Sequence, residues 1–219
     1  MIFGRIDAGH ARRSGMKGWI AGSLLGLVAC CNTAWAEEGW VDMQGRPIPP
    51  SESANSVGGF SAAVMMTTDA DWEAKWNTPP ETVPSFHTAN EVSPHGELYI
   101  LTFVSNPQVD PATGKTDVVC DVVMHRPDGT VSASAVDQPC LQGELRGDPR
   151  NVYLTGVSMK YMEEPADARG VWSFSVVAKD RVRGVAVPLR ASFLVKGQMP
   201  RRRPSAADGQ GAASPAQNR

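Results

Sequence analysis

Short segments rich in β-branched and aromatic residues follow one another from Glu97 to Lys196. Segments such as "ELYILTFVS" (97–105) and "TDVVCDVVMHR" (116–126) alternate with turn sequences, among them "DPATGK" (110–115) and Pro-Asp-Gly (127–129). Strand-length segments that recur about every ten residues between such turns are typical of antiparallel sandwiches and barrels. We therefore predict an all-β fold, an antiparallel sandwich.

The distribution of apolar residues predicts which strands are central. The 97–105 segment is apolar on both faces, with Leu98 and Ile100 on one side and Leu101 and Phe103 on the other, which predicts a strand buried on both sides. In the last two segments, "GVWSFSVVAKD" (170–180) and "VAVPLRASFLVK" (185–196), apolar residues recur at every second position, which predicts that only one face of each strand is buried. The predicted buried residues are Trp172, Phe174, Val176, Val185, Val187, Leu189, Phe193 and Val195.

The closing hairpin also carries a family resemblance. The segment Ala166–Val195 resembles the final hairpin of immunoglobulin-like and fibronectin-type-III-like domains, with Gly170 and Trp172 in the places of the family's glycine and aromatic residue. The resemblance extends loosely over the rest of the strand-rich region. Cys140 precedes Trp172, so the antibody-type Cys…Trp…Cys order is absent. The resemblance implies a divergent immunoglobulin-like sandwich.

A helix is expected before the strand-rich region. "FSAAVMMTT" (60–68) predicts the first strand, and Asp69 is a suitable N-cap for the short helix "ADWEAKW". Trp72 and Trp76 are four residues apart and share one helical face. We expect this helix to cross the open end of the sandwich and to bury at least one of the two tryptophans there.

The chain begins with features of a signal peptide. Basic residues precede a short apolar run, and Ala34-Trp35-Ala36 provides a site for cleavage between Ala36 and Glu37. A second interpretation is a lipobox ending at Cys30, which would give a lipid-anchored protein. Met1 and Met16 both remain possible starts. Export to the bacterial periplasm, free or anchored, is predicted in either case.

The predicted organisation has four parts. A signal peptide covers 1–36, an extended arm 37–58, the sandwich 59–196, and a disordered tail 197–219, whose composition lacks aromatic and β-branched residues. Removing 1–36 lowers the basic residues from 21 to 17 and the acidic residues from 23 to 22, so the net charge becomes −5. An acidic balance offers no electrostatic basis for binding nucleic acid.

Cysteine usage fits export. Cleavage after Ala36 leaves Cys120 and Cys140 as an even pair in an oxidising compartment, which predicts a disulfide. Two buried free thiols are the alternative. No CxxC motif is present, so a redox-active pair is not expected.

Catalytic motifs are absent from the sequence. No GxSxG elbow, phosphate loop, HExxH or calcium loop occurs, so we expect no enzymatic activity and no cofactor. His87, Glu91 and His95 recur every four residues, and a metal-dependent hydrolase built on them is the enzyme alternative. Pro94 and its polar neighbours disfavour the helix that this spacing would need, so no metal site is expected.

Binding is the remaining class of function. Aromatic anchors rimmed by charge are typical of protein interfaces. We expect a non-catalytic envelope protein, most specifically an immunity protein that blocks a secreted toxin acting in the periplasm. The alternative is an accessory lipoprotein. The candidate partner-binding residues are Asp69, Asp71, Trp72, Glu73, Trp76, Tyr161, Met162, Glu163 and Glu164.

Overall fold

The computed structural model describes residues 39–42, 44–79 and 83–196. The predicted signal peptide, both cleavage sites and the predicted tail lie outside these residues. Among the described residues, no helix is long and apolar enough to cross a membrane. The elements are β1 (Ala54–Val57), β2 (Phe60–Thr67), α1 (Trp72–Trp76), β3 (Glu91–Val92), β4 (Glu97–Ser105), β5 (Lys115–His125), β6 (Val131–Glu144), β7 (Val152–Met162), β8 (Gly170–Asp180) and β9 (Val185–Val195).

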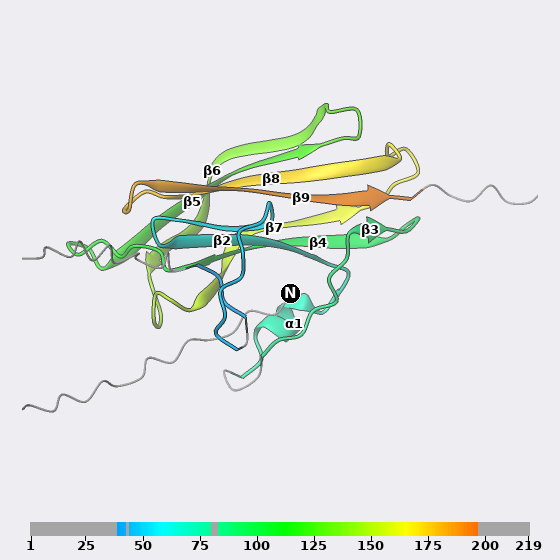
Figure 1. The fold of residues 1–219 in the computed structure, drawn as a ribbon. Helices are drawn as coiled ribbons and strands as arrows, with labels where there is room; N and C mark the ends of the chain where they lie inside the picture. Colours follow the sequence, from blue (N-terminus) through cyan, green and yellow to red (C-terminus); the bar gives the residue numbers. More distant parts are fainter. Residues whose placement is uncertain (1–38, 43, 80–82, 197–219) are drawn as a thin grey trace, which may run out of the picture.

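The strands form two sheets that pack face to face (Figure 1). The four-stranded sheet has the order β1-β2-β4-β7, and the five-stranded sheet has the order β3-β9-β8-β5-β6. The predicted all-β sandwich with one short helix is thereby confirmed. One pair departs from the antiparallel expectation, because β3 runs parallel to β9 and pairs Glu91 with Leu194 and Val92 with Val195.

The predicted faces of the strands are confirmed. The core between the sheets contains Leu98 and Ile100 of β4 together with the inward residues of β8 and β9, including Trp172, Phe174 and Phe193. Burial of these large side chains supplies the main driving force for folding. At the start of β8, Gly170 has a φ of +126°, and a Cβ there would meet Pro127, so this position requires glycine.

The helix lies on the outer face of the four-stranded sheet, and the prediction that it plugs the end of the sandwich is wrong (Figure 1). Leu101 and Phe103 of β4 point outward and need a cover. The Trp76 ring packs 5.2 Å from the Phe103 ring, and the Trp72 ring packs 6.3 Å from the Tyr99 ring. Their spacing of four residues lets one short helix place both tryptophans on neighbouring outward residues of β4.

Part of the segment expected as an extended arm joins the fold. β1 pairs with β2, and Trp40 is buried against the outer face, where its indole N–H donates to the Ala62 carbonyl at 3.0 Å. The prolines and glycines of 39–50 favour an irregular path, but they do not prevent one aromatic side chain from packing on the sheet.

Cys120 and Cys140 form a disulfide between the adjacent strands β5 and β6, with their Cα atoms 5.7 Å apart. Both residues are buried. Strand β6 continues to Glu144, farther than the predicted hairpin, because bulges interrupt its pairing with β5 without ending it. Asp137 lies in this irregular part, with a φ of +53°.

Candidate functional site

Two of the three acidic residues around α1, Asp69 and Asp71, form ion pairs with Lys75. The carboxylate of Asp69 accepts from Lys75 at 2.8 Å and from the backbone N–H of His87 at 2.9 Å. Burial disfavours its charged form, but these hydrogen bonds outweigh burial and hold the pKa of Asp69 well below its usual range. Asp71, and not Asp69, is the N-cap residue of α1, and its side chain makes no capping hydrogen bond. Glu73 is exposed.

The predicted binding residues at the end of β7 divide between its two faces. Tyr161 points inward, where its ring lies 4.9 Å from the Phe193 ring and its hydroxyl donates to Asp167 at 2.7 Å. Burial, together with this hydrogen bond, raises the pKa of Tyr161. Met162 is 54 % exposed, and Glu164 is also exposed. Tyr161 is therefore a packing residue, and Met162 and Glu164 remain available at the surface.

Glu163 is buried, and the expectation that it belongs to a solvated charged rim is wrong. Its carboxylate forms an ion pair with Arg169 and accepts from the backbone N–H of His95 at 2.5 Å. These two donors hold the pKa of Glu163 below its ordinary value. Arg169 also donates to the carbonyl of Lys196 at 3.3 Å. The Glu163–Arg169 pair therefore connects the segment at His95, the segment that follows β7 and the residue that follows β9, and its role is structural.

The structure brings some of the candidate binding residues around α1 and some of those at the end of β7 onto the same face of the four-stranded sheet. Strand pairing places Met162 beside Glu97 and Lys160 beside Tyr99, on the outer side of the four-stranded sheet, where Trp72 packs on Tyr99. Lys160 pairs with Glu97 at 2.7 Å and lies over the Tyr99 ring. Trp72 is half-buried, and Lys160 and Met162 are exposed beside it.

The three residues of the metal alternative have separate partners. His87 contacts Asp69 at 2.9 Å, Glu91 pairs with Lys196 at 2.7 Å, and His95 lies 4.0 Å from Glu163. No group of three or more His, Cys, Asp or Glu residues within the described part of the chain is arranged to hold a metal ion.

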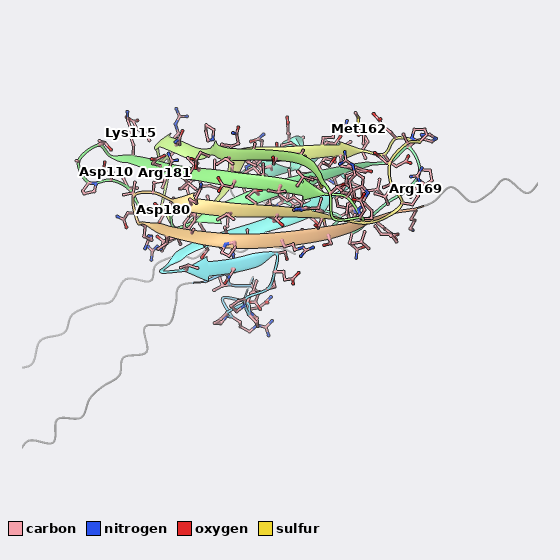
Figure 2. All side chains as sticks on the ribbon, turned by 90° about the horizontal axis from the view of Figure 1, so that it is seen from above. Asp110, Lys115, Met162, Arg169, Asp180 and Arg181 are labelled. Atoms are coloured by element: carbon pink, nitrogen blue, oxygen red, sulfur yellow. A yellow bond between two sulfur atoms is a disulfide. The ribbon has the colours of Figure 1, made fainter. Side chains whose placement is uncertain are left out.

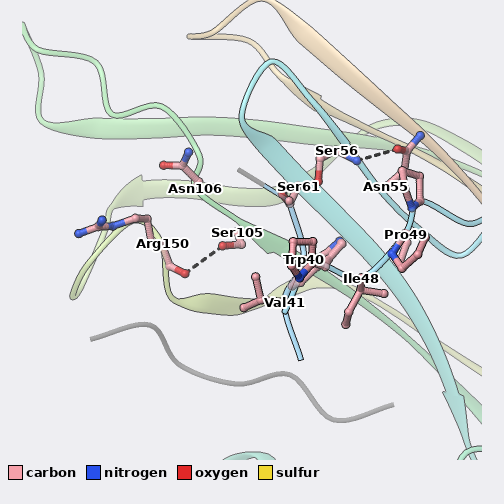
Figure 3. Close-up of a pocket in the computed structure, with 14 residues that line it drawn as sticks. Trp40, Val41, Ile48, Pro49, Asn55, Ser56, Ser61, Ser105, Asn106 and Arg150 are labelled. Carbon is pink, nitrogen blue, oxygen red and sulfur yellow. Dashed lines mark hydrogen bonds between the residues drawn. The ribbon is translucent and has the colours of Figure 1, made fainter. Parts of the chain in front are cut away.

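A groove of about 500 Å³ lies on the outer face of the four-stranded sheet, and sequence reasoning did not identify it (Figure 3). One wall is the arm, which contributes Trp40, Val41 and the segment 47–50 with its three prolines. Strand pairing places Ser56 opposite Ser61 and Ser61 opposite Ser105, so these three serines form a continuous row across β1, β2 and β4. The groove thus combines an apolar wall with a row of hydroxyl groups.

The other side of the groove carries Asn106 and Arg150, opposite Asn55 and Pro49 (Figure 3). Several of its polar groups are held in place. Ser105 donates to the Arg150 carbonyl at 3.0 Å, and Asn106 donates to the Gly59 carbonyl at 2.8 Å. Internal hydrogen bonds of this kind keep a site preformed before a ligand arrives.

Among the described residues that line the groove, Arg150 is the one with an ionisable side chain, and its guanidinium contacts Asp148 at 3.2 Å. An arginine remains protonated and does not act as a general base at neutral pH. Searches against protein-family models and against curated protein sequences found no match to this chain.

Proposed function

We propose that this chain is a non-catalytic binding protein of the bacterial envelope, and that the groove beside the arm holds an extended segment of a protein partner. The observation that carries the proposal is the lining of the groove. It offers apolar side chains such as Ile48 and Pro49 on one wall and hydroxyl and amide groups of Ser105 and Asn106 on the other side. Apolar contact supplies affinity, and placed polar groups fix orientation.

An extended peptide matches this arrangement. Its backbone N–H and C=O groups would meet the hydroxyl and amide groups of the groove, while its side chains would contact the proline-rich wall. The row Ser56-Ser61-Ser105 crosses three strands spaced about 4.8 Å apart, and therefore extends over about 10 Å, which corresponds to roughly three residues of extended chain.

The resemblance to immunoglobulin-like and fibronectin-type-III-like domains is part of the proposal. The strand orders β2-β4-β7 and β9-β8-β5-β6 support it, because they pair the last two strands of the chain at one side of the five-stranded sheet. For the class of partner, we propose a secreted toxin that acts in the periplasm, which makes this chain an immunity protein. The predicted export signal and the acidic mature chain support that assignment.

The cellular test is deletion of the gene in a strain that carries the neighbouring toxin gene. Sister cells are then expected to poison one another, and the exported form is expected to rescue them, whereas a form lacking 16–36 is not. Unchanged competition, together with no binding of the purified chain to the neighbouring gene product, contradicts the immunity assignment and favours the accessory lipoprotein.

A variant pair tests the groove itself. Ile48→Glu places a charge in the apolar wall and is expected to abolish protection and binding. Val136→Glu is the matched control, because Val136 is 68 % exposed on β6 and does not line the groove. Equal protection by both variants, with both folded as judged by circular dichroism, would place partner binding elsewhere.

A further inference from the structure

The outer face of the five-stranded sheet differs from that of the four-stranded sheet. Trp40 and the two tryptophans of α1 cover the four-stranded sheet. Figure 2 views the molecule from above the five-stranded sheet, where β8 and β9 lie side by side. The outward residues of β9 are all exposed: Ala186, Pro188, Arg190, Ser192 and Leu194.

Strand register divides this surface, here called the open face, into four rows that run across the strands. Row one pairs Val171 with Leu194. Row two contains Val131, His125, Ser173 and Ser192; row three contains Ser134, Val123, Ser175 and Arg190; and row four contains Asp121, Val177 and Pro188.

Small and apolar side chains dominate the open face. Val171 is 58 % exposed and Leu194 is 39 % exposed, side by side on β8 and β9, and Val131 is 52 % exposed on β6. Contiguous exposed apolar residues on a soluble domain mark an interaction surface. The serines around them have short side chains, and one of them, Ser173, is buried.

Most charges at the edge of this face neutralise one another. Lys179 contacts Asp121 at 2.7 Å and Asp137 at 2.5 Å, and Arg181 contacts Asp137 at 3.0 Å. Two cations and two anions therefore balance. Arg190 forms no ion pair with any residue that the structure describes, and its neighbours in the next row are serines.

We propose that the open face packs against the open face of a second copy of this chain to form a two-fold symmetric dimer. The two-fold axis lies in the plane of the interface, parallel to the rows and between rows two and three. Rotation about it places row one of each copy over row four of the other. Leu194 then meets Pro188, and Val171 meets Val177. Arg190 meets Ser192, so its charge faces a hydroxyl and not a second arginine.

The area of the open face is sufficient for a reversible dimer. The four rows hold 13 positions, and with strands about 4.8 Å apart and rows about 6.6 Å apart they outline roughly 400 Å² per copy. Two copies bury roughly 800 Å² together, which is the size of a weak, transient interface. We therefore expect a dissociation constant in the micromolar range rather than a permanent dimer. Because the groove lies on the other sheet, dimerisation leaves it open.

The test is sedimentation equilibrium of the exported chain over micromolar to submillimolar concentrations. The unchanged chain is expected to shift from monomer to dimer. The double variant Val171→Asp, Leu194→Asp is expected to weaken the dimer more than about tenfold, because four carboxylates enter an apolar contact. Met162→Asp is the matched control, since Met162 is 54 % exposed, close to the 58 % of Val171, but lies on β7 of the other sheet.

A second measurement needs no substitution. Methyl NMR resonances of Val171 and Leu194 in the unchanged chain are expected to shift with concentration, whereas that of Met162 is not. A monomer at every concentration overturns the proposal, as does a dimer that the double variant leaves intact, because it would use another surface. A monomer whose open face binds a different protein also overturns it. None of these results bears on the groove.

Discussion

Reduction of the Cys120–Cys140 disulfide should destabilise the sandwich by a predictable amount. The bridge joins residues separated by 20 positions, and closing a loop of this length removes about 3 kcal/mol of conformational freedom from the unfolded chain. In a domain of this size, each kcal/mol shifts the melting temperature by about 2–4 °C. Reduction alone is therefore expected to lower the melting temperature by about 6–12 °C. The double variant Cys120→Ala, Cys140→Ala also removes two buried sulfur atoms, at roughly 1 kcal/mol each, and should melt lower still.

Thermal unfolding followed by circular dichroism, with and without reductant, measures both effects. Alkylation of the folded chain gives the matching chemical test, because both thiols should react only after reduction. The double alanine variant should show no response to reductant, which controls for effects of the reductant elsewhere. A double variant that melts within about 2 °C of the oxidised chain would refute the reasoning, since neither the cross-link nor the buried sulfur would then contribute.

Three further outcomes are expected. The pKa of Glu163 is lower in the folded chain than in the unfolded chain, so its contribution to stability is present above the unfolded pKa and is lost as the pH falls through the folded pKa. Glu163→Gln should therefore reduce the loss of stability at acidic pH, measured by denaturant unfolding at a series of pH values. An unchanged loss of stability at acidic pH would contradict this. Trp76→Ala removes a half-buried ring from Phe103 and should lower the free energy of unfolding by about 2–3 kcal/mol in urea, whereas a loss below about 0.5 kcal/mol would show that α1 packs weakly. The mature chain should begin at Glu37, as N-terminal sequencing will show, and palmitate incorporation that disappears in Cys30→Ser would instead establish the lipoprotein.

The strands and their faces could be predicted because their signals are local. Alternation with a period of two along β8 and β9, and apolar residues on both sides of β4, determine which side chains are buried whatever the partners are. The disulfide followed from the even number of cysteines expected after export. Each of these inferences needed only the composition of one segment or the total of one residue type.

The location of α1 and the groove depended on contacts between distant segments. The spacing of Trp72 and Trp76 showed that they share a face, but not which surface would cover that face. The serine row exists because the registers of β1, β2 and β4 align Ser56, Ser61 and Ser105. The burial of Glu163 likewise required Arg169 to approach it, and a glutamate beside another glutamate in sequence gives no sign of that partner.

The short parallel pairing of β3 with β9 also limits how this protein can aggregate. The Leu194 N–H donates to Asn90 at 2.8 Å and the Lys196 N–H donates to Val92 at 3.1 Å, while farther along β9 the Arg190 N–H donates to Glu52 at 2.6 Å. Pro188 has no N–H to offer. A β-strand from another molecule would therefore find most of the N–H groups at this edge already occupied or absent, which disfavours fibril growth by strand addition at β9.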